Sequence, residues 1–418
     1  MTRFEAAACK SRKKTLVVVA ALIAICGVVA RAVHASSDSL RRGVSTALTV
    51  VFVLAVIAQA QTFTVFYNFT IPGGVRPYAG VVQDPSGNLY GTTELGGDGR
   101  GVVYELNTAG SETVLYNFRR APADGTKPQT PLARDKTGNL YGTTSSGGYH
   151  HWGTVFKIDT AGNETVLHHF LGHADGCSPS QGLVIDSSGT LFGTTSYCGS
   201  SEKGTIFKID AAGTFTLLHS FTGTSSDGAQ PQWGHLALGK SGELYGVTWG
   251  GGAYGSGVLY KLSRNKTFAV LHSFGYGTDG SAPAGSVLRD DAGNLYGTTY
   301  AGGSGLGGIV WKLSKDGGET ILHNFAGGSS DGCGSYAGVS RDSRGNLYGV
   351  TLYCGAYGYG ALYELTAAGS LTLLHSFDRT DGENPVGEVL RTTNGELFGT
   401  TFVGGAYGDY GVLWEYLP

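Results

Sequence analysis

The segment GNLYGTT occurs three times without change, at residues 87–93, 138–144 and 293–299. Four near-copies begin at Gly189, Gly242, Gly345 and Gly395. The aromatic residue of each copy returns every 50 to 53 residues, at Tyr90, Tyr141, Phe192, Tyr245, Tyr296, Tyr348 and Phe398. A repeat of this length indicates a solenoid or a propeller in which each unit is one supersecondary element.

Each unit contains four short segments that alternate in polarity or are rich in aromatic residues. In the second unit these segments are QTPLARD (129–135), NLYGTT (139–144), GTVFKID (153–159) and ETVLHHF (164–170), with glycine-containing turns between them. Four antiparallel strands in about 51 residues are typical of a propeller blade. The sequence therefore predicts an all-β fold, a seven-bladed β-propeller of four-stranded blades.

The two ends of the repeat region are complementary. The seventh unit stops at GVLWEYLP (411–418), before its fourth strand. The segment TFTVFYNF, Thr62–Phe69, matches the fourth strand ETVLYNF (112–118) of the first unit. We therefore predict that Thr62–Phe69 completes the last blade and closes the ring, which leaves no blade with an unpaired inner edge.

Residues 1–60 contain two apolar runs, at 15–30 and 44–60, each after basic residues. The second run ends in Ala58-Gln59-Ala60, a small-x-small pattern of signal-peptidase sites. We predict an export leader over 1–60, a secreted or periplasmic propeller over 61–418 and a mature chain that begins at Gln61. The alternative is a retained N-terminal anchor, which would be the protein's contact with a membrane.

Charge argues against nucleic acid as a partner. Of 29 basic and 32 acidic residues, eight basic and two acidic ones lie in residues 1–60, so the remainder carries a net charge of −9. We find no basic stripe in that remainder, and such a domain repels phosphate backbones.

The consensus DxxGNLYGTTxxGGxxxxGxVFKLxxxGxETVLHxFxxxxDGxxP resembles the GloVer-type (Gloeo/Verruco) tandem repeat of exported bacterial proteins. The resemblance covers essentially all of residues 62–418. It implies an extracytoplasmic repeat protein and brings no functional residues with it. The first unit departs from the consensus, because GGVRP (Gly73–Pro77) stands in place of DGxxP.

Four cysteines occupy two repeat positions in two units. Cys177 and Cys198 lie in the third unit, and Cys333 and Cys354 in the sixth. Propeller geometry brings the two positions together on one face, which predicts the disulfides Cys177–Cys198 and Cys333–Cys354. Each would stabilise the fold by roughly 3 kcal/mol and requires an oxidising compartment. A metal site of four thiolates is the rival interpretation, but the pairs lie three blades apart.

Two sets of repeated polar residues are expected to be structural. One repeat position is filled by His168, His219, His272, His323 and His375, with Tyr67 and Tyr116 in the other two units. We see no carboxylate at ligand spacing beside them and predict packing, not a metal site. The DG loops carry Asp124, Asp175, Asp227, Asp279, Asp331 and Asp381. We expect these to cap turns; the alternative is Ca²⁺ binding at the channel mouth. No cofactor is predicted.

The Gly-rich loops between the second and third segments of each unit carry many aromatic residues. Our candidate ligand-binding residues are Tyr149, Trp152, Trp249, Tyr254, Tyr353, Tyr357, Tyr407 and Tyr410. Aromatic faces beside hydroxyl groups suit carbohydrate binding. The alternative is that these rings only cover the loops. No nucleophile elbow, zinc motif or phosphate loop is visible, so no catalytic residue is predicted.

These observations favour a monomeric, non-enzymatic, extracytoplasmic binding or scaffold module, with a polysaccharide or a cell-envelope component as partner. One alternative is a carbohydrate-active enzyme, a lyase or glycoside hydrolase, with its site at the channel mouth. A second is a protein-interaction scaffold. An enzyme requires a few unrepeated polar residues that converge at the channel mouth, which is the feature that distinguishes the first two.

Overall fold

The computed structural model describes residues 61–71, 73–119, 122–275 and 277–418. The predicted leader, residues 1–60, lies outside this range. The regular structure of the described residues is β-strand. Among them, no helix is long and apolar enough to cross a membrane.

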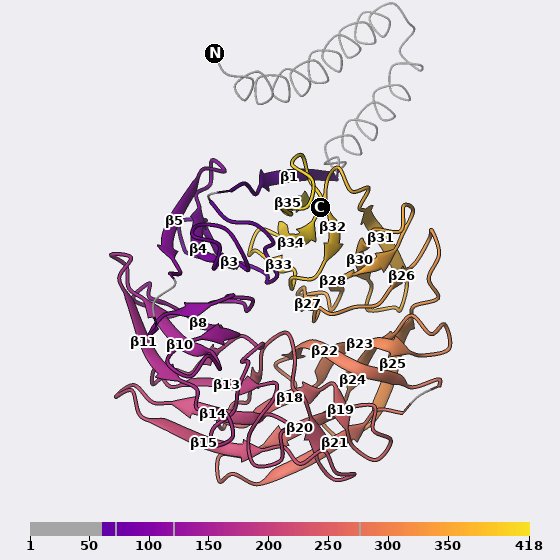
Figure 1. Cartoon of the computed structure of the whole chain (residues 1–418). Helices are drawn as coiled ribbons and strands as arrows, with labels where there is room; N and C mark the ends of the chain where they lie inside the picture. The colour runs from indigo at the N-terminus through magenta and orange to yellow at the C-terminus, as the bar shows by residue number, and fades with distance from the viewer. Residues whose placement is uncertain (1–60, 72, 120–121, 276) are drawn as a thin grey trace, which may run out of the picture. The chain divides into compact units, whose positions relative to one another are not determined.

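Seven antiparallel sheets follow one another around a ring, as the sequence predicts (Figure 1). From inner to outer strand, blade 1 is β2 (Val82–Gln83), β3 (Leu89–Thr93), β4 (Val102–Leu106) and β5 (Glu112–Asn117). Blade 2 is β7 (Ala133–Arg134), β8 (Leu140–Thr144), β10 (Thr154–Ile158) and β11 (Glu164–His169). Blade 3 is β12 (Val184–Ile185), β13 (Leu191–Thr195), β14 (Thr205–Ile209) and β15 (Phe215–Ser220).

Blades 4 to 6 are β17 (Ala237–Leu238), β18 (Leu244–Thr248), β20 (Val258–Leu262), β21 (Phe268–Ser273); β22 (Gly280–Arg289), β23 (Leu295–Gly302), β24 (Ile309–Leu313), β25 (Glu319–Asn324); and β27 (Ser340–Arg341), β28 (Leu347–Thr351), β30 (Ala361–Leu365), β31 (Leu371–Ser376). Blade 7 is β33 (Leu390–Arg391), β34 (Leu397–Val403), β35 (Val412–Leu417) and β1 (Thr62–Asn68), with β32 (Glu383–Pro385) also paired to β34.

The N-terminal strand closes the ring, as predicted. β1 pairs antiparallel with β35, from Thr62 opposite Leu417 to Asn68 opposite Val412. In Figure 1 the indigo β1 lies beside the yellow β35. The outermost strand of blade 7 therefore comes from the other end of the described chain, and the blade is complete.

The repeated segment GNLYGTT has a structural explanation in each of its parts. In the first unit, Asp84 accepts hydrogen bonds from the backbone N–H groups of Ser86 and Asn88 at 2.8 and 2.9 Å, and the Tyr90 hydroxyl donates to it at 3.1 Å. A Cβ at Gly91 would lie 2.4 Å from the Tyr104 hydroxyl oxygen, so only glycine fits beneath that ring. The repeat thus specifies one capped turn and one covered strand per blade.

The turn in the fifth unit is capped in the same way. The carboxylate of Asp290 accepts the Asn294 backbone N–H at 2.8 Å.

An aromatic belt joins all seven blades. The phenylalanine that follows each outer strand contacts an aromatic ring on the third strand of the next blade, with centroids 5.1 Å apart for Phe69–Tyr104 and 6.1 Å apart for Phe377–Trp414. The other pairs are Phe118–Phe156, Phe170–Phe207, Phe221–Tyr260, Phe274–Trp311 and Phe325–Tyr363. Both interfaces of blade 7 use the same contact, so the closed blade packs like the others.

Six of the seven inner strands are shorter than predicted, with two residues each, whereas β22 has ten. The sequence indicates a strand over 129–135, but β7 contains only Ala133 and Arg134. Before the inner strands the backbone bonds to the next blade instead; Gly182 N–H donates to Gly234 O at 2.6 Å. A Cβ at Gly285 would lie 2.3 Å from the Gly338 nitrogen, so these inner backbones approach too closely for side chains.

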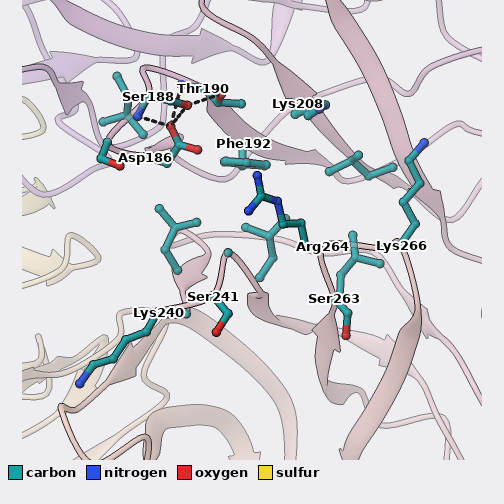
Figure 2. Close-up of a pocket in the computed structure, with 18 residues that line it drawn as sticks. Asp186, Ser188, Thr190, Phe192, Lys208, Lys240, Ser241, Ser263, Arg264 and Lys266 are labelled. Carbon is teal, nitrogen blue, oxygen red and sulfur yellow. Dashed lines mark hydrogen bonds between the residues drawn. The ribbon is translucent and has the colours of Figure 1, made fainter.

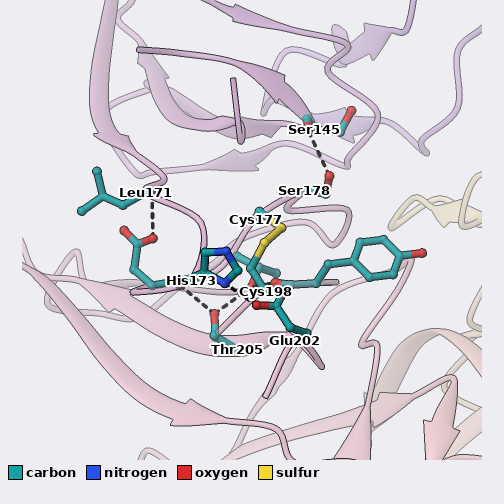
Figure 3. Close-up of a disulfide and its surroundings, with 11 residues drawn as sticks. Ser145, Leu171, His173, Cys177, Ser178, Cys198, Glu202 and Thr205 are labelled. Atoms are coloured by element: carbon teal, nitrogen blue, oxygen red, sulfur yellow. Dashed lines mark hydrogen bonds and ion pairs between the residues drawn. A yellow bond between two sulfur atoms is a disulfide. The ribbon is translucent and has the colours of Figure 1, made fainter. Parts of the chain in front are cut away.

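The cysteine-bearing loops lie on one face, which we call the disulfide face. In three blades the DG loop pairs with the loop after the repeated segment through two short strands of two residues each. The pairs are β6 (Gly125–Thr126) with β9 (Ser146–Gly147), β16 (Gly228–Ala229) with β19 (Gly250–Gly251), and β26 (Gly332–Cys333) with β29 (Tyr353–Cys354). Both predicted disulfides are present, with Cα atoms 5.4 Å apart in Cys177–Cys198 (Figure 3) and 5.5 Å apart in Cys333–Cys354.

One cysteine of each disulfide occupies a backbone position that favours glycine. Cys198 has φ 61° and Cys354 φ 65°, whereas the other five units have Gly96, Gly147, Gly251, Gly302 and Gly404, all with positive φ. We expect Cys177→Ala/Cys198→Gly to be about 1 kcal/mol more stable than Cys177→Ala/Cys198→Ala, because glycine relieves the left-handed backbone once the bond is lost. Urea denaturation of the two variants measures the difference, and equal stabilities would contradict the strain.

Candidate functional site

Six aromatic side chains from five blades meet on the disulfide face, at the end of the central channel. We call them the mouth cluster: Tyr78, Trp233, Trp249, Tyr300, Tyr336 and Phe402. Ring centroids lie 4.6 Å apart for Trp233–Tyr336 and Tyr300–Tyr336, and 5.3 Å apart for Trp233–Trp249. Tyr78 contacts Phe402 at 5.2 Å. All six rings are half-buried, so each retains an accessible edge or face.

Two repeat positions supply the mouth cluster. Trp249, Tyr300 and Phe402 directly follow the repeated seven-residue segment of their units, whereas Tyr78, Trp233 and Tyr336 precede the inner strands. Burial raises the pKa of Tyr336, and a hydrogen bond with Tyr300 raises it further. Burial also raises the pKa of Tyr78, although a hydrogen bond with Trp233 opposes the change. The hydroxyl groups of Tyr78 and Tyr336 therefore stay neutral across the physiological pH range.

A polar pocket of about 270 Å³ lies beside the mouth cluster, and we call it the mouth pocket. Its lining is Tyr78, Gln129, Ser145, Ser178, Ser180, Ser196, Tyr197, Gln232 and Trp233. The Gln232 amide donates to the Tyr197 hydroxyl at 3.4 Å. The Ser178 hydroxyl donates to the Ser145 carbonyl at 3.3 Å, as Figure 3 shows. This lining offers hydroxyls, amides and aromatic rings and carries no charge.

Each disulfide lies next to residues that line the mouth. Cys177 precedes Ser178, and Cys198 follows Tyr197, so the first disulfide fixes two residues of the mouth pocket. In the second disulfide, Cys354 follows Tyr353. Its partner Cys333 precedes Gly334, where a Cβ would lie 3.1 Å from Tyr300. Each disulfide therefore supports one side of the mouth.

Of the predicted ligand-binding residues, the structure brings two to the mouth. Trp249 belongs to the mouth cluster, and Tyr353 lies beside it with 44% of its surface exposed. The rest do not join it: Tyr149, Trp152, Tyr254, Tyr357, Tyr407 and Tyr410. Tyr149, for example, packs on His169 at the end of an outer strand, with centroids 4.4 Å apart. Tyr254 is 71% exposed.

Five of the six residues of the mouth cluster are not among the predicted ligand-binding residues. Tyr78, Trp233 and Tyr336 lie in the segment between the DG loop and the inner strand, where the units differ most in residue type. The equivalent residues in the other units are Gln129, Ser180, Ala284 and Val386. The signal in the sequence that could have identified them is that this one position varies between units while its flanking residues are nearly constant.

The repeated histidines do have carboxylate partners, which corrects our expectation. His168, His219, His272, His323 and His375 contact the DG-loop aspartates of their own blades at 2.7 to 3.2 Å. The loop folds back over the end of its outer strand and brings the aspartate, six to eight residues later, onto the imidazole. The predicted turn role is confirmed, because each aspartate also accepts a backbone N–H, as Asp175 does from Leu171 at 2.7 Å.

The departure GGVRP in the first unit is compensated. Gly73 stands where the other units have aspartate, and the Tyr67 hydroxyl donates instead to Glu112 of blade 1, at 2.8 Å. A Cβ at Gly73 would overlap that carboxylate.

Three unrepeated polar residues meet inside the channel. His235, Ser286 and Glu388 share one repeat position with Gly80, Pro131, Gly182 and Gly338. Glu388 Oε2 accepts from the Ser286 hydroxyl at 2.6 Å and lies 3.1 Å from His235 Nε2. Burial lowers the pKa of His235, but the charge of Glu388 outweighs burial and raises it to about 9. We call these three residues the channel trio. Within it, His235 and Glu388 form an ion pair between blades 4 and 7.

Little space separates the channel trio from the mouth. The cavity between them has a volume of about 20 Å³, enough for a single water molecule. On the opposite face, His235 and Glu388 border a funnel of about 430 Å³ that is also lined by Arg341 and Arg391.

A separate hollow of about 620 Å³ lies between blades 3 and 4. Its lining includes Lys208, Lys240, Arg264 and Lys266 (Figure 2). Figure 2 shows Arg264 extending towards Phe192, beneath the turn that Asp186 caps. The cations come from two turns and one strand, so they form no stripe in the sequence.

Comparisons with known proteins agree with this fold. The family model described as the Gloeobacter/Verrucomicrobia repeat matches residues 40–238 and 224–414. No curated protein matches the chain in sequence. Virginiamycin B lyase from Staphylococcus aureus superposes with a TM-score of 0.58 at 12% identity, over 86% of this chain and 99% of that one.

Two further similar structures are extracellular domains from B. thetaiotaomicron, described as parts of hybrid two component systems. Their TM-scores are 0.54 and 0.55 at 13% and 10% identity, over 86% and 84% of this chain but 41% and 39% of theirs. At these identities the likeness shows the fold alone. The sequence match, together with the seven repeated blades, establishes that the chain belongs to the Gloeobacter/Verrucomicrobia repeat family.

Proposed function

We propose that the protein is an extracytoplasmic binding module that recognises a neutral glycan at the mouth of its propeller. The observation that carries the proposal is the mouth pocket. Aromatic rings stand there beside four serine hydroxyls and two glutamine amides, without a charged side chain in the lining.

The chemistry of the mouth pocket matches that of a neutral sugar. A pyranose presents C–H groups on its faces, which pack on aromatic rings, and hydroxyls at its edge, which pair with amides and hydroxyls. The volume of about 270 Å³ is near the lower end for small-ligand pockets, which suits one sugar unit of a chain that continues over the open face. Exposed rings such as Tyr353 would extend the contact to neighbouring units.

The location of the protein belongs to the same proposal. Two disulfides are consistent with an oxidising, extracytoplasmic compartment, where polysaccharides occur. Reduction would free Ser178 and Tyr197, so glycan binding should depend on that compartment.

The channel trio is the observation that favours an enzyme as the second candidate. These unrepeated polar residues converge, but they bond to one another, and a space of about 20 Å³ separates them from the mouth. A polysaccharide at the mouth cannot reach Glu388 through that space. Binding without turnover is therefore the better supported function.

The test offers purified, oxidised protein a panel of neutral and acidic polysaccharides in native gels, with released reducing ends and unsaturated sugars measured on the same samples. We expect retention by a neutral polysaccharide without products. Trp233→Ala and Trp249→Ala should each weaken retention at least tenfold, because each removes a stacking face.

Tyr254→Ala is the matched control, since this ring is 71% exposed and outside the mouth cluster. It should bind like the unaltered protein. Released products would move the assignment to the enzyme candidate and its channel trio. Retention that survives both tryptophan substitutions, or no retention at all, would contradict the proposed site and favour a protein-interaction scaffold.

A further inference from the structure

The outer-strand histidines differ in what the next blade places against them. Phe215, Phe268 and Phe63 stack on His168, His219 and His375, with centroids 3.9, 4.2 and 3.5 Å apart. At the remaining histidine interfaces, the equivalent residue is Leu371 beside His323 and Glu319 beside His272. His272 is thus the repeated histidine that has a carboxylate on each side.

The three side chains are close enough to share one ion. His272 Nε2 lies 3.2 Å from Asp279 Oδ2 and 3.4 Å from Glu319 Oε1. Within the described ranges this is the one set of three or more His, Cys, Asp or Glu residues whose ligand atoms all lie within 4.8 Å of one another. Zn²⁺ bonds of about 2.0–2.1 Å in a tetrahedron place neighbouring ligand atoms about 3.3 Å apart.

Hydrogen bonding leaves the group unsatisfied without a cation. Nε2 of His272 can carry at most one proton, and its hydrogen-bond partner is Asp279, at 3.2 Å. Glu319 Oε1 is buried and accepts no hydrogen bond. Two carboxylates therefore face one N–H donor, and a divalent ion between the three atoms would satisfy all of them.

The surroundings suit a metal ligand set. Asp279 is oriented by the backbone N–H groups of Gly275 and Gly280, both at 2.8 Å. Such outer contacts hold a ligand in place. The His272, Asp279 and Glu319 side chains are 22, 26 and 23% exposed, which leaves room for water to complete the coordination.

We propose that His272, Asp279 and Glu319 form a Zn²⁺ site that ties blade 4 to blade 5 at the outer edge of the propeller. One imidazole and two carboxylates are a mixed donor set that suits zinc better than Ca²⁺, which takes oxygen ligands. The ion joins β21 to β25 and keeps an open position for water.

The test titrates Zn²⁺ into metal-stripped, oxidised protein by calorimetry. We expect a site with a stoichiometry of one, and Glu319→Gln should weaken it at least tenfold, because the amide keeps the shape but loses the charge. His272→Tyr should do the same while the fold is kept, since it copies Tyr116, which already lies between Asp124 and Glu164 at the first interface, at 3.2 and 3.0 Å.

A gain-of-site variant gives a second readout. Leu371→Glu should raise the stoichiometry to two, because it adds the missing carboxylate beside His323 and Asp331, which are already 3.2 Å apart. A stoichiometry that stays at one would contradict the role of the third carboxylate. The proposal fails if the unaltered protein binds no Zn²⁺, or if Glu319→Gln and His272→Tyr leave its affinity unchanged, which would place the ion on exposed histidines such as His173.

Discussion

Deletion of Thr62–Asn68 is expected to abolish cooperative unfolding of the propeller. The deleted strand contributes Phe63, which stacks on His375 at 3.5 Å, and Val65, Phe66 and Tyr67, which pack on the cores of blade 7. Burial of such side chains contributes about 1.5–3 kcal/mol each, so the total is on the order of 6 kcal/mol. This is comparable to the whole stability of a typical domain. Thermal and urea denaturation followed by circular dichroism measure the loss.

Point variants separate ring closure from a general loss of surface. Phe63→Ala should cost about 2–3 kcal/mol. Val114→Ala, on the outer strand of blade 1 where the side chain is 40% exposed, should cost under about 0.5 kcal/mol. The deleted form should also self-associate, because β35 becomes a free edge. A monomeric deletion variant with an unchanged transition would show that the ring does not depend on β1.

Glu388→Ala is expected to destabilise the protein by about 1–2 kcal/mol at pH 6, because it leaves the His235 imidazolium, whose side chain is 34% exposed, in the channel without its partner. The Ser286 hydroxyl loses its acceptor in the same change. The double variant His235→Ala/Glu388→Ala should recover much of this loss, since no unpaired charge remains. A double variant as unstable as the sum of the single variants would contradict the ion pair.

The effect should depend on pH in a defined window. Since the pKa of His235 is raised to about 9, the stability it contributes is complete below its ordinary value near 6.5 and is lost as pH rises through about 9. Burial raises the pKa of Glu388, but the charge of His235 outweighs burial and lowers it, so its contribution is complete above the ordinary carboxyl pKa and is lost as pH falls through the lowered pKa. The difference between Glu388→Ala and the unaltered protein should therefore be largest near pH 5–6.5 and small above pH 9.

Local repetition made the fold predictable. In five of the seven units the repeat specifies a turn that an aspartate caps, and in every unit it specifies a strand whose glycine lies under a ring, as Gly91 lies under Tyr104. The missing fourth strand of the last unit and its copy at Thr62 predicted ring closure. The pairing of the cysteines was predictable from the sequence because each pair occupies the same two repeat positions.

The candidate site was less predictable, because it forms where different units meet. Trp233 and Tyr336 are 103 residues apart and contact each other across the channel mouth. His235 and Glu388 pair between blades 4 and 7. A repeat alignment shows that such residues break the pattern but not which of them meet. The contact between His272 and Asp279 was missed for another reason, the fold-back of the DG loop.

The most direct test of the proposed function is a crystal structure of the oxidised protein with an oligosaccharide from the polysaccharide that it retains best. We predict a sugar ring stacked on Trp233 or Trp249, with its hydroxyls bonded to Gln129 or Gln232. A sugar bound instead over Tyr254 and Tyr357, or in the basic hollow beside Arg264, would contradict the proposal that the mouth of the propeller is the binding site.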